Sequence, residues 1–321
     1  MPGTMRAFAA PRIGPIEDCR MVEMPMPEPG PGQARVRVIA AALNPADAKT
    51  ILGRTGLLHA KVFPLVMGYD LSGVIDAVGP GVDDLRVGTE VFGMLAYSKR
   101  TRLGSLAEYT VLPAAWLSEK PTAMDHQTAA ASATSGLTAL QGLRGPGRMK
   151  DGARVLVTGA SGGVGSLVVG LARFLGGSAD AITSKAGVAL AQSLGAGIVI
   201  DRNAPDAFAA LREPYDIVYD AAAAYSMRTF ARVLRKGGTY VTTLPKLATL
   251  ADFLASPLLG RRVRMVMVKP ARADLATVAK AIAGGVQVPI AKRVSLADAG
   301  AALADFDKNG AHGKVVVRVA V

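Results

Sequence analysis

The sequence predicts an α/β fold in two parts, a β-rich region and a doubly wound parallel sheet, and three observations support it. The chain has 321 residues, which is enough for two ordinary domains. Strand and helix patterns alternate from residue 154 to residue 244, as in βαβ units. Four glycines within residues 159–165 separate the first of these strands from its helix, which indicates a very tight turn.

The region before about residue 116 has the pattern of a compact, partly barrel-like β domain. Short runs of alternating and β-branched residues are interrupted by proline and glycine at close intervals, which is typical of strands joined by turns. These runs lie at 33–43, 70–82, 88–95 and 106–113, and residues 23–33 are expected to form a surface connection.

The region after residue 116 changes to helices and strands. A helical composition covers 124–143, and the βαβ pattern follows it. We expect strands at 154–159, 178–183, 197–201, 216–221 and 239–244, with helices at 165–176, 187–195 and 226–235. The C-terminal part is mixed, with strands at 262–268 and 313–321 and helices at 273–285 and 296–310.

The composition excludes several classes of protein. Cys19 is the one cysteine, so a disulfide framework and a cysteine-rich zinc site are both excluded, and a reducing cytosol is expected. The N-terminus lacks the apolar core of a secretory signal. Residues 155–172 carry no charge, but the glycines inside them argue against a membrane span. We therefore expect a soluble cytoplasmic protein.

The net charge is +12, with short basic runs at 99–102 and 261–264. A solvated basic surface is the preferred interpretation. Nucleic-acid binding is disfavoured, because no aromatic residues are interleaved with these runs and no recognised module surrounds them. Part of the charge could instead attract a polyanionic cofactor.

The glycine turn predicts a dinucleotide site. Gly162 and Gly165 match the last two glycines of the G-x-G-x-x-G fingerprint, and alanine stands at the first. Gly162 lets backbone approach a pyrophosphate, Gly165 lets the helix lie close to the strand, and the helix N-terminus supplies free amides. The predicted cofactor-binding residues of this turn are Ala160, Ser161, Gly162, Gly163 and Val164.

The end of the second strand favours NADPH over NADH. An NAD site usually places a carboxylate there, to bind the ribose hydroxyls. Here the strand ends in Thr183, Ser184 and Lys185, and Arg202 follows the next strand. Two hydroxyls and two cations suit a 2′-phosphate, so these four residues are predicted to bind it. An ordinary exposed lysine at a helix start remains the alternative for Lys185.

Several segments together resemble the medium-chain dehydrogenase/reductase superfamily. They are NPADAK at 44–49, MGYDLSGVIDAVGPGV at 67–82, ASGGVG at 160–165, SLGAGIVID at 193–201, DIVYDA at 216–221 and GKVVV at 313–317. The resemblance covers nearly the whole chain. It implies a GroES-like catalytic domain over 1–122 and 266–321, and an inserted Rossmann-type, NADP(H)-binding domain over 123–265.

The zinc-dependent branch of the superfamily does not match. Its catalytic cysteine would fall at Asn44, and its Gly-His-Glu motif at Gly68, Tyr69 and Asp70. These residues lack the thiolate and imidazole of a catalytic zinc site, and the three histidines, His59, His126 and His312, are scattered. No metal is therefore expected. The chain instead resembles the zinc-independent quinone oxidoreductase and enone (alkenal) reductase branch, although Gly187 stands where relatives commonly have lysine, and Arg202 where they often have tyrosine.

This resemblance implies an NADPH-dependent reductase that transfers hydride to a small-molecule quinone or α,β-unsaturated carbonyl. Lys49 is implied as the cation that stabilises the developing oxyanion, Asn44 as a hydrogen-bond donor, and Tyr69 as a donor or aromatic wall. Further residues that the family layout places near the cofactor are Thr138, Leu244, Met267, Val268 and Lys314.

A homodimer formed through the edge strand at 263–268 is also expected from the resemblance. Two alternatives stay open from the sequence. One is a non-catalytic NADPH-binding protein of crystallin-like or RNA-binding type, and the other is an alcohol dehydrogenase-like oxidoreductase. No Ser-His-Asp pattern argues for nucleophilic catalysis.

Overall fold

A computed structural model describes residues 3–54, 62–97, 103–205, 207–209, 211, 214–244, 247–256 and 258–319. The chain forms two compact units. Unit 1 comprises Met1–Thr134, Lys269–Ala279 and Ile290–Val321, and unit 2 comprises Ser135–Val268 and Lys280–Pro289. The sequence placed the divisions at 122/123 and 265/266, so the first division lies twelve residues later than expected, inside a helix. The basic run at 99–102 and His59 lie outside the described residues.

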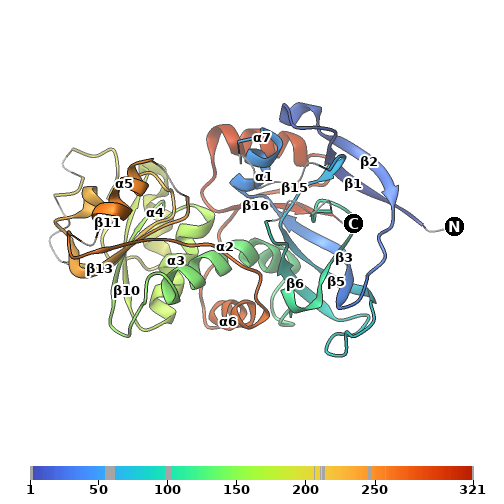
Figure 1. The fold of residues 1–321 in the computed structure, drawn as a ribbon, viewed down its shortest axis with the longest axis horizontal. Helices are drawn as coiled ribbons and strands as arrows, with labels where there is room; N and C mark the ends of the chain where they lie inside the picture. The colour runs from blue at the N-terminus through green and yellow to red at the C-terminus, as the bar shows by residue number, and fades with distance from the viewer. Residues whose placement is uncertain are drawn as a thin grey trace. The chain divides into compact units, whose positions relative to one another are not determined.

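Unit 1 is built on two mostly antiparallel sheets (Figure 1). The smaller has the strand order β2 (Arg20–Pro25), β1 (Thr4–Ala10), β4 (Leu65–Val66). The larger runs β15 (Ile290–Ser295), β16 (Lys314–Arg318), β3 (Gln33–Ala42), β5 (Asp70–Val78), β6 (Glu90–Met94), β8 (Leu117–Glu119). β7 (Tyr109–Pro113) also pairs with β3.

Alternation along β3 places one set of side chains in the core of unit 1. Ala34, Val36 and Val38 are fully buried, and they join Leu71 and Ile75 of β5 in one apolar cluster. Each fully buried valine or leucine contributes roughly 1.5–3 kcal/mol. Helices α1 (Pro45–Ile51) and α7 (Ala299–Asn309) pack beside each other on this unit (Figure 1). The C-terminal part of the chain, through α7, thereby contacts α1, the helix that carries Lys49 and follows Asn44.

Unit 2 is built on a parallel sheet whose described strands have the order β11, β10, β9, β12, β13, β14. This is the 3-2-1-4-5-6 order of dinucleotide-binding folds, and every pairing in it is parallel. The strands are β9 (Arg154–Thr158), β10 (Ser178–Thr183), β11 (Val199–Asp201), β12 (Tyr215–Asp220), β13 (Leu234–Thr242) and β14 (Arg262–Met265). The predicted doubly wound sheet is therefore confirmed.

The helices of unit 2 begin close to the expected positions, with one exception. They are α3 (Gly163–Phe174) and α4 (Val188–Ser193), while α5 (Leu247–Ala255) was not predicted from the sequence. Helices α2 (His126–Arg144) and α6 (Arg272–Ala283) cross the division between the units. Among the residues described here, no helix is long and apolar enough to span a bilayer.

The helix expected at 226–235 was wrong. A short 3₁₀ turn, Met227–Phe230, replaces it, and β13 already begins at Leu234. The reason is tertiary: the guanidinium of Arg261 donates to the carbonyls of Ala231 and Leu234, which satisfies acceptors that a helix would otherwise use. Leu234 then pairs with Tyr215 in the sheet.

Candidate functional site

Most of the predicted cofactor residues of unit 2 follow the carboxyl ends of parallel strands. The glycine turn follows β9, Thr183 ends β10, and Arg202 follows β11. Leu244 lies two residues after β13, and Met267 lies two after β14. Because ligands of doubly wound sheets bind at this edge, the fold gathers on one side residues that are far apart in sequence.

The glycine turn has the geometry that the sequence predicted. Gly159 has a φ of +66°, and the amide of Gly162 donates to its carbonyl at 3.0 Å. A Cβ on Gly165 would lie 2.1 Å from the Gly159 oxygen, so no side chain fits where the helix approaches the turn. A Cβ on Gly162 would meet only that oxygen, at 3.4 Å. The turn is closed on its inner side and open above Gly162.

Helix α3 begins at this turn without a side-chain cap. Gly162 is the N-cap residue, so the cap position itself offers the first-turn amides no side-chain acceptor. The partial positive charge of a twelve-residue helix adds to these donors. The residues present therefore fit a pyrophosphate, which would accept hydrogen bonds from the amides and meet no side chain at Gly162.

Ser161 connects the turn to the second strand. Its hydroxyl lies 2.6 Å from that of Thr183, and both residues are buried. A Cβ on Gly187 would lie 2.4 Å from the Thr183 oxygen and 2.5 Å from the Ser161 oxygen. Gly187 is thus required by this hydroxyl pair. The glycine where relatives commonly have lysine has a local steric reason.

The predicted 2′-phosphate residues lie around the tips of β10 and β11. The amide of Arg202 donates to the Thr183 carbonyl at 2.8 Å, which brings Arg202 beside the turn that contains Ser184 and Lys185. The side chains of Lys185 and Arg202 are exposed. Asp201, which the sequence reasoning overlooked, stands opposite Thr183 in the register. The position of Asp201 at the end of a short predicted strand was the feature of the sequence that could have identified it.

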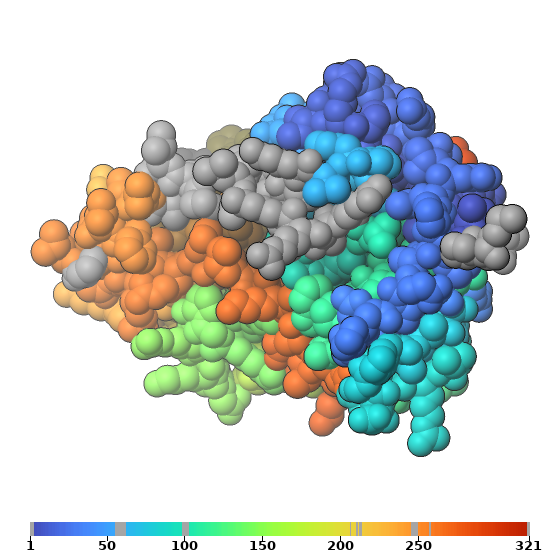
Figure 2. Space-filling model, turned by 45° about the vertical axis from the view of Figure 1, so that its right-hand side comes forward, coloured from blue at the N-terminus to red at the C-terminus, as the bar shows by residue number. Residues whose placement is uncertain are grey.

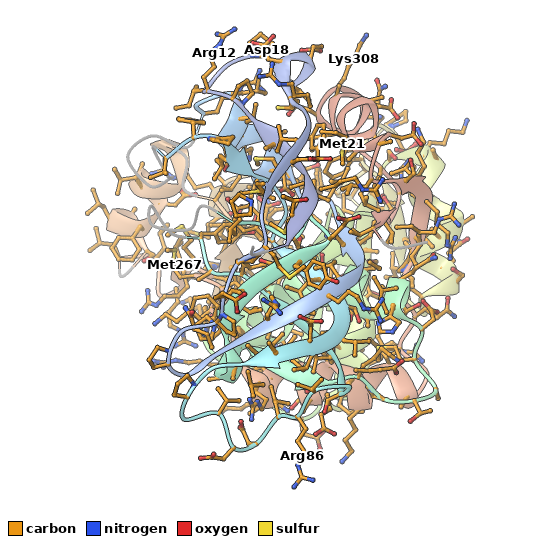
Figure 3. The ribbon with its side chains drawn as sticks, turned by 90° about the vertical axis from the view of Figure 1, so that its right-hand side faces the viewer. Arg12, Asp18, Met21, Arg86, Met267 and Lys308 are labelled. Atoms are coloured by element: carbon orange, nitrogen blue, oxygen red, sulfur yellow. The ribbon has the colours of Figure 1, made fainter. Side chains whose placement is uncertain are left out.

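The remaining predicted cofactor residues differ in exposure. Leu244 and Met267 are exposed, at 43% and 64%, and Val268 is half-buried. Met267 is one of the residues labelled in Figure 3. Thr138 is buried on α2, and its carbonyl accepts a hydrogen bond from the Tyr219 hydroxyl at 2.7 Å. Lys314 belongs to unit 1, so it lies with the predicted catalytic residues.

In unit 1, Asn44 and Asp47 open helix α1. Asn44 is the N-cap residue and Pro45 occupies the first helical position. The Asp47 carboxylate accepts from the amide of Asn44 at 2.7 Å and from the amide of Gly68 at 2.9 Å. Gly68 has a φ of +99°, and a Cβ there would lie 2.4 Å from the Ser105 hydroxyl. Asp47 therefore fixes the start of α1 to the segment before β5.

Complete burial raises the pKa of Asp47 to about 7. The negative charge of Asp70 raises the pKa further, while the two backbone hydrogen bonds and the charge of Lys314 lower it. The carboxyl group consequently titrates near neutral pH, although no solvent reaches it.

Asp70 and Lys314 form a buried ion pair at the first residue of β5. Their side chains are 0% and 4% exposed, and Lys314 Nζ lies 2.8 Å from Asp70 Oδ2. Lys314 Nζ also donates to Asn44 Oδ1 at 2.7 Å, while Asn44 Nδ2 donates to Asp70 Oδ2 at 2.9 Å. Asp70 accepts a third hydrogen bond from the amide of Thr134. Sequence reasoning missed this role of Asp70, although a carboxylate that opens an apolar strand was a signal.

Both polar atoms of the Asn44 side-chain amide are thus hydrogen-bonded within the protein. Its oxygen accepts from Lys314, and its nitrogen donates to Asp70 and, at 3.4 Å, to the Ala42 carbonyl. Asn44 is 6% exposed. Its expected role as a donor to substrate would require it to release Asp70, and that role stays a prediction.

Tyr69 and Lys49 complete the site. The hydroxyl of Tyr69 lies 3.2 Å from that of Thr50, and the Thr50 hydroxyl donates its one proton to the Ala46 carbonyl. Tyr69 is therefore the donor of the pair. The rings of Tyr69 and Tyr97 lie 4.4 Å apart, and Lys49, half-buried on α1, precedes Thr50. The three predicted catalytic residues thus lie on α1 and on the segments that hold it.

The residues around Asn44 do not fit a zinc ion. The amide of Asn44 is a poor ligand, and the Asp70 carboxylate already binds an ammonium group that would repel a second cation. Within the part of the chain that the structure describes, no cluster of three or more His, Cys, Asp or Glu residues could hold a metal.

Ser72, His126 and Glu90 meet in unit 1 but do not form a nucleophilic triad. His126 Nδ1 lies 2.8 Å from the Ser72 hydroxyl, and its Nε2 lies 3.4 Å from Glu90. The Ser72 hydroxyl is fully buried and donates to the Val91 carbonyl, so its proton is not available to the imidazole. Burial, followed by the charge of Lys120, lowers the pKa of His126.

Comparison with known families agrees with this architecture. Residues 30–122 match the alcohol dehydrogenase GroES-like domain, and residues 194–317 match the zinc-binding dehydrogenase family. The fold resembles the quinone oxidoreductase from Coxiella burnetii with a TM-score of 0.88, at 26% identity over 99% of this chain and 100% of that one. An NAD-dependent alcohol dehydrogenase gives the same TM-score at 27% identity, over 98% of this chain and 100% of that one.

Three curated relatives are plant reductases. A 2-methylene-furan-3-one reductase from Solanum lycopersicum is 38% identical, and an NADPH-dependent alkenal/one oxidoreductase from Arabidopsis thaliana is 37% identical. Each match covers 64% of this chain and 53% of the relative, so the chain spans about half the length of these relatives. A chloroplast envelope quinone oxidoreductase homolog from Arabidopsis thaliana is 31% identical over 70% of both chains. The chain therefore belongs to the medium-chain dehydrogenase/reductase superfamily, in its branch of quinone and alkenal reductases, which are oxidoreductases that use a nicotinamide cofactor.

Proposed function

We propose that this protein is an NADPH-dependent reductase of quinones or α,β-unsaturated carbonyl compounds that works without zinc. One observation carries the cofactor part of the proposal. The open glycine turn and uncapped start of α3 lie at the carboxyl end of the central strand of a six-stranded parallel sheet. The names of the relatives support the substrate class, since they include reductases of alkenals, furanones and quinones.

NADPH is preferred over NADH because of the charges at the tips of β10 and β11. Lys185 and Arg202 are both exposed there, beside the hydroxyl-bearing Ser184, and Asp201 is the one carboxylate at these two tips among the residues that the structure describes. The two cations can bind a 2′-phosphate through charge-assisted hydrogen bonds. When bound, the nicotinamide supplies the hydride.

Lys49 supplies the compact positive charge that stabilises the oxygen on which negative charge develops. Tyr69 orients a flat substrate beside its ring and gives up its hydrogen bond to Thr50 when it donates to that oxygen. Asn44 positions α1 through its bonds to Asp70 and Lys314. Asp47 holds the same helix by accepting two backbone amides. A proton from water completes the reduced product.

The zinc-free part of the proposal rests on the Asp70–Lys314 pair. The ammonium group of Lys314 already contacts Asn44 Oδ1 and Asp70 Oδ2, the oxygen atoms that a metal ion beside Asn44 would need as ligands. A metal analysis of the purified protein tests this part. Stoichiometric zinc that survives dialysis against a chelator would contradict it.

The cofactor experiment compares NADPH and NADH by fluorescence titration. We expect Lys185→Gln/Arg202→Gln to weaken NADPH binding by about a hundredfold or more, since two hydrogen bonds to charged groups are lost and each is worth about 1.5–3 kcal/mol. Binding of NADH should stay unchanged. Lys308→Gln, an exposed lysine of unit 1 labelled in Figure 3, is the control. Tighter binding of NADH than NADPH by the natural sequence would refute the NADPH assignment.

The catalytic experiment follows NADPH oxidation with a panel of quinones and enones. Lys49→Met should lower kcat by about a hundredfold or more, as expected for loss of an oxyanion-stabilising group, and leave the Kd for NADPH unchanged. Lys49→Arg should restore part of the rate. NADPH binding without turnover of any acceptor would favour a non-catalytic binding protein and would contradict the proposal.

A homodimer through β14 is part of the proposal. β14 is the last strand of the described sheet, so one of its edges has no partner strand. Exposed apolar side chains lie on β14 and on either side of it: Met265 ends the strand, Met267 follows it and Leu258 precedes it. This segment contributes to the orange surface in Figure 2. Sedimentation analysis of the natural sequence and of Met265→Asp tests it, because a dimer through this edge should dissociate in the variant.

A cytoplasmic location is also part of the proposal. The single cysteine supports it, because a chain that forms no internal disulfide suits a reducing compartment.

A further inference from the structure

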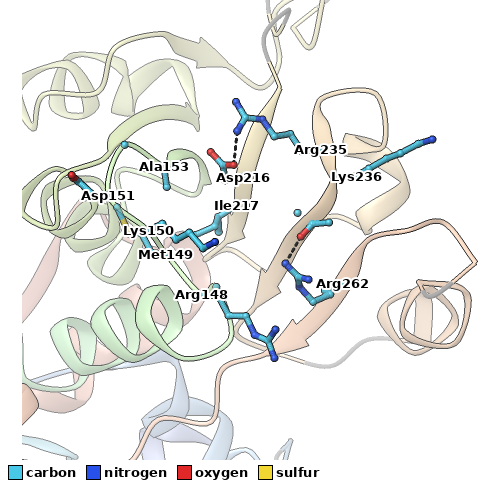
Figure 4. Close-up of a pocket in the computed structure, with 14 residues that line it drawn as sticks. Arg148, Met149, Lys150, Asp151, Ala153, Asp216, Ile217, Arg235, Lys236 and Arg262 are labelled. Atoms are coloured by element: carbon cyan, nitrogen blue, oxygen red, sulfur yellow. Dashed lines mark hydrogen bonds and ion pairs between the residues drawn. The ribbon is translucent and has the colours of Figure 1, made fainter.

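A pocket of about 340 Å³ lies at the amino ends of the strands of unit 2 (Figure 4). It is formed by the loop between α2 and β9, the first residues of β12, the start of β13 and the start of β14. The lining residues are Gly147, Arg148, Met149, Lys150, Asp151, Gly152, Ala153, Asp216, Ile217, Arg235, Lys236, Gly237, Gly238 and Arg262. Its volume is within the range of small-molecule sites, about 300–1,000 Å³.

The lining is strongly cationic. It includes three arginines and two lysines against two aspartates, which leaves a net charge of +3 in one cavity. Three separate segments contribute the cations, so the concentration of charge is a product of the fold. Clefts lined by one sign of charge concentrate ions of the opposite sign.

Two of the cations are held in place. Arg235 pairs with Asp216 at 2.7 Å, and Asp216 also accepts from the amide of Arg154 at 2.9 Å. Arg262 donates to the carbonyl of Gly237 and, at 3.2 Å, to the hydroxyl of Thr239. Figure 4 draws the Arg235–Asp216 and Arg262–Gly237 contacts as dashed lines. These two guanidinium groups therefore form an ordered part of the wall.

Three cations are not used by the fold. Among the described residues, no acidic or hydrogen-bonding partner contacts the side-chain nitrogens of Arg148, Lys150 or Lys236, and all three residues are exposed. Lys236 points away from the other lining residues in Figure 4. Arg148 and Lys150 thus remain as cations that a ligand could recruit. Arg148 also has a φ of +51°, an unusual conformation for a non-glycine residue.

The apolar part of the lining is small. It consists of Met149, Ala153 and Ile217, and no aromatic side chain lines the pocket. Four glycines expose polar backbone instead. A nucleobase would find no ring to stack on, whereas a compact anion needs only the cations and the backbone.

We propose that this pocket binds a compact polyanion that carries two or more phosphate groups, at a site separate from that of the dinucleotide. The two sites lie at opposite ends of β9: Ala153 precedes the strand and the glycine turn follows it. Five residues of strand separate them by about 16 Å. One pyrophosphate cannot bridge both sites, so the pocket requires its own ligand.

The test uses inorganic tripolyphosphate and isothermal titration calorimetry at constant ionic strength, with and without saturating NADPH. With NADPH bound at the glycine turn, we expect one saturable site for tripolyphosphate. Arg148→Gln/Lys150→Gln should weaken it by about tenfold or more, because two charge-assisted contacts are lost. These exposed residues have no partner among the residues that the structure describes, so the melting temperature should change little.

Two variants serve as matched controls. Arg86→Gln/Lys308→Gln removes the same charge from the surface of unit 1 (Figure 3) and should change the affinity by less than about twofold. Lys185→Gln/Arg202→Gln changes the opposite edge of the sheet and should leave tripolyphosphate binding intact.

Four results would overturn the proposal. They are the absence of saturable binding, an equal loss in the surface control, competition by NADPH, and ATP binding more tightly than tripolyphosphate. The first result excludes a binding site. The second would show that binding depends on the overall positive charge of the protein and not on this pocket. The third moves the site to the dinucleotide edge, and the fourth requires contacts to a base that the pocket does not offer. None of these results depends on whether the protein reduces quinones or enones.

Discussion

Replacement of Lys314 by methionine tests whether the buried ion pair organises unit 1. The substitution keeps a long apolar side chain in the same space and removes only the ammonium group. Asp70 would then keep the Thr134 amide and the Asn44 amide as donors, but it would be left as a buried anion without a cation. The Asn44 oxygen would lose its partner as well.

The expected loss can be bounded from these contacts. Removal of one partner of a buried pair usually costs about 3–5 kcal/mol. Two hydrogen bonds to Asp70 survive, so the lower value, about 3 kcal/mol, is expected for Lys314→Met. A unit of this size loses about 2–4 °C of melting temperature per kcal/mol, which corresponds to about 6–12 °C. The pKa of Asp47 should also rise, because the charge of Lys314 lowers it.

The chain offers a direct probe of this loss. Trp116, its single tryptophan, belongs to unit 1 and packs against its core, so tryptophan fluorescence during urea unfolding reports on that unit. Asp70→Asn/Lys314→Met should cost less than the sum of the two single substitutions, since it leaves neither an unpaired anion nor an unpaired cation.

A matched control is available in the same unit. Lys292 lies 3.6 Å from Asp305, and both side chains are 52% exposed, so Lys292→Met should cost less than about 0.5 kcal/mol. If Lys314→Met were as stable as Lys292→Met, the reasoning about the buried pair would be wrong.

Three further predictions concern the carboxylate and the glycines. The free energy of unfolding should fall as pH rises from about 4 to about 7, because folded Asp47 retains a proton up to about pH 7 that the unfolded chain releases near pH 3.8. Asp47→Asn should lack this pH-dependent loss of stability. Urea titrations of both proteins at pH 5 and 7.5 measure the loss. An equal change in the free energy of unfolding between the two pH values in both proteins would contradict the prediction. Gly187→Lys should lower both the melting temperature and NADPH affinity by displacing the Ser161 hydroxyl, and a variant as stable as the natural sequence would show that this hydroxyl moves freely. Gly165→Ala should abolish NADPH binding in fluorescence titrations and destabilise unit 2, whereas Gly162→Ala should preserve the melting temperature; similar melting temperatures for the two would be the opposing result.

The sequence by itself predicted the parts of this protein that depend on neighbouring residues. The parallel sheet followed from the period of strands and helices, and the glycine turn followed from residues 159–165. A missing Cβ and an uncapped helix start are local properties, so they can be read from consecutive residues. The departure at Gly187 was also visible in the sequence, although its reason was not.

Tertiary structure decided the features that depend on distant residues and on burial. Lys314 meets Asp70 across 244 positions and Asn44 across 270, and these contacts hold the amide that the sequence assigned to substrate. Arg261 satisfies the carbonyls of the segment expected as a helix at 226–235. Removal of a charge from water and satisfaction of a backbone acceptor depend on whatever the fold brings alongside, and no local pattern records that partner.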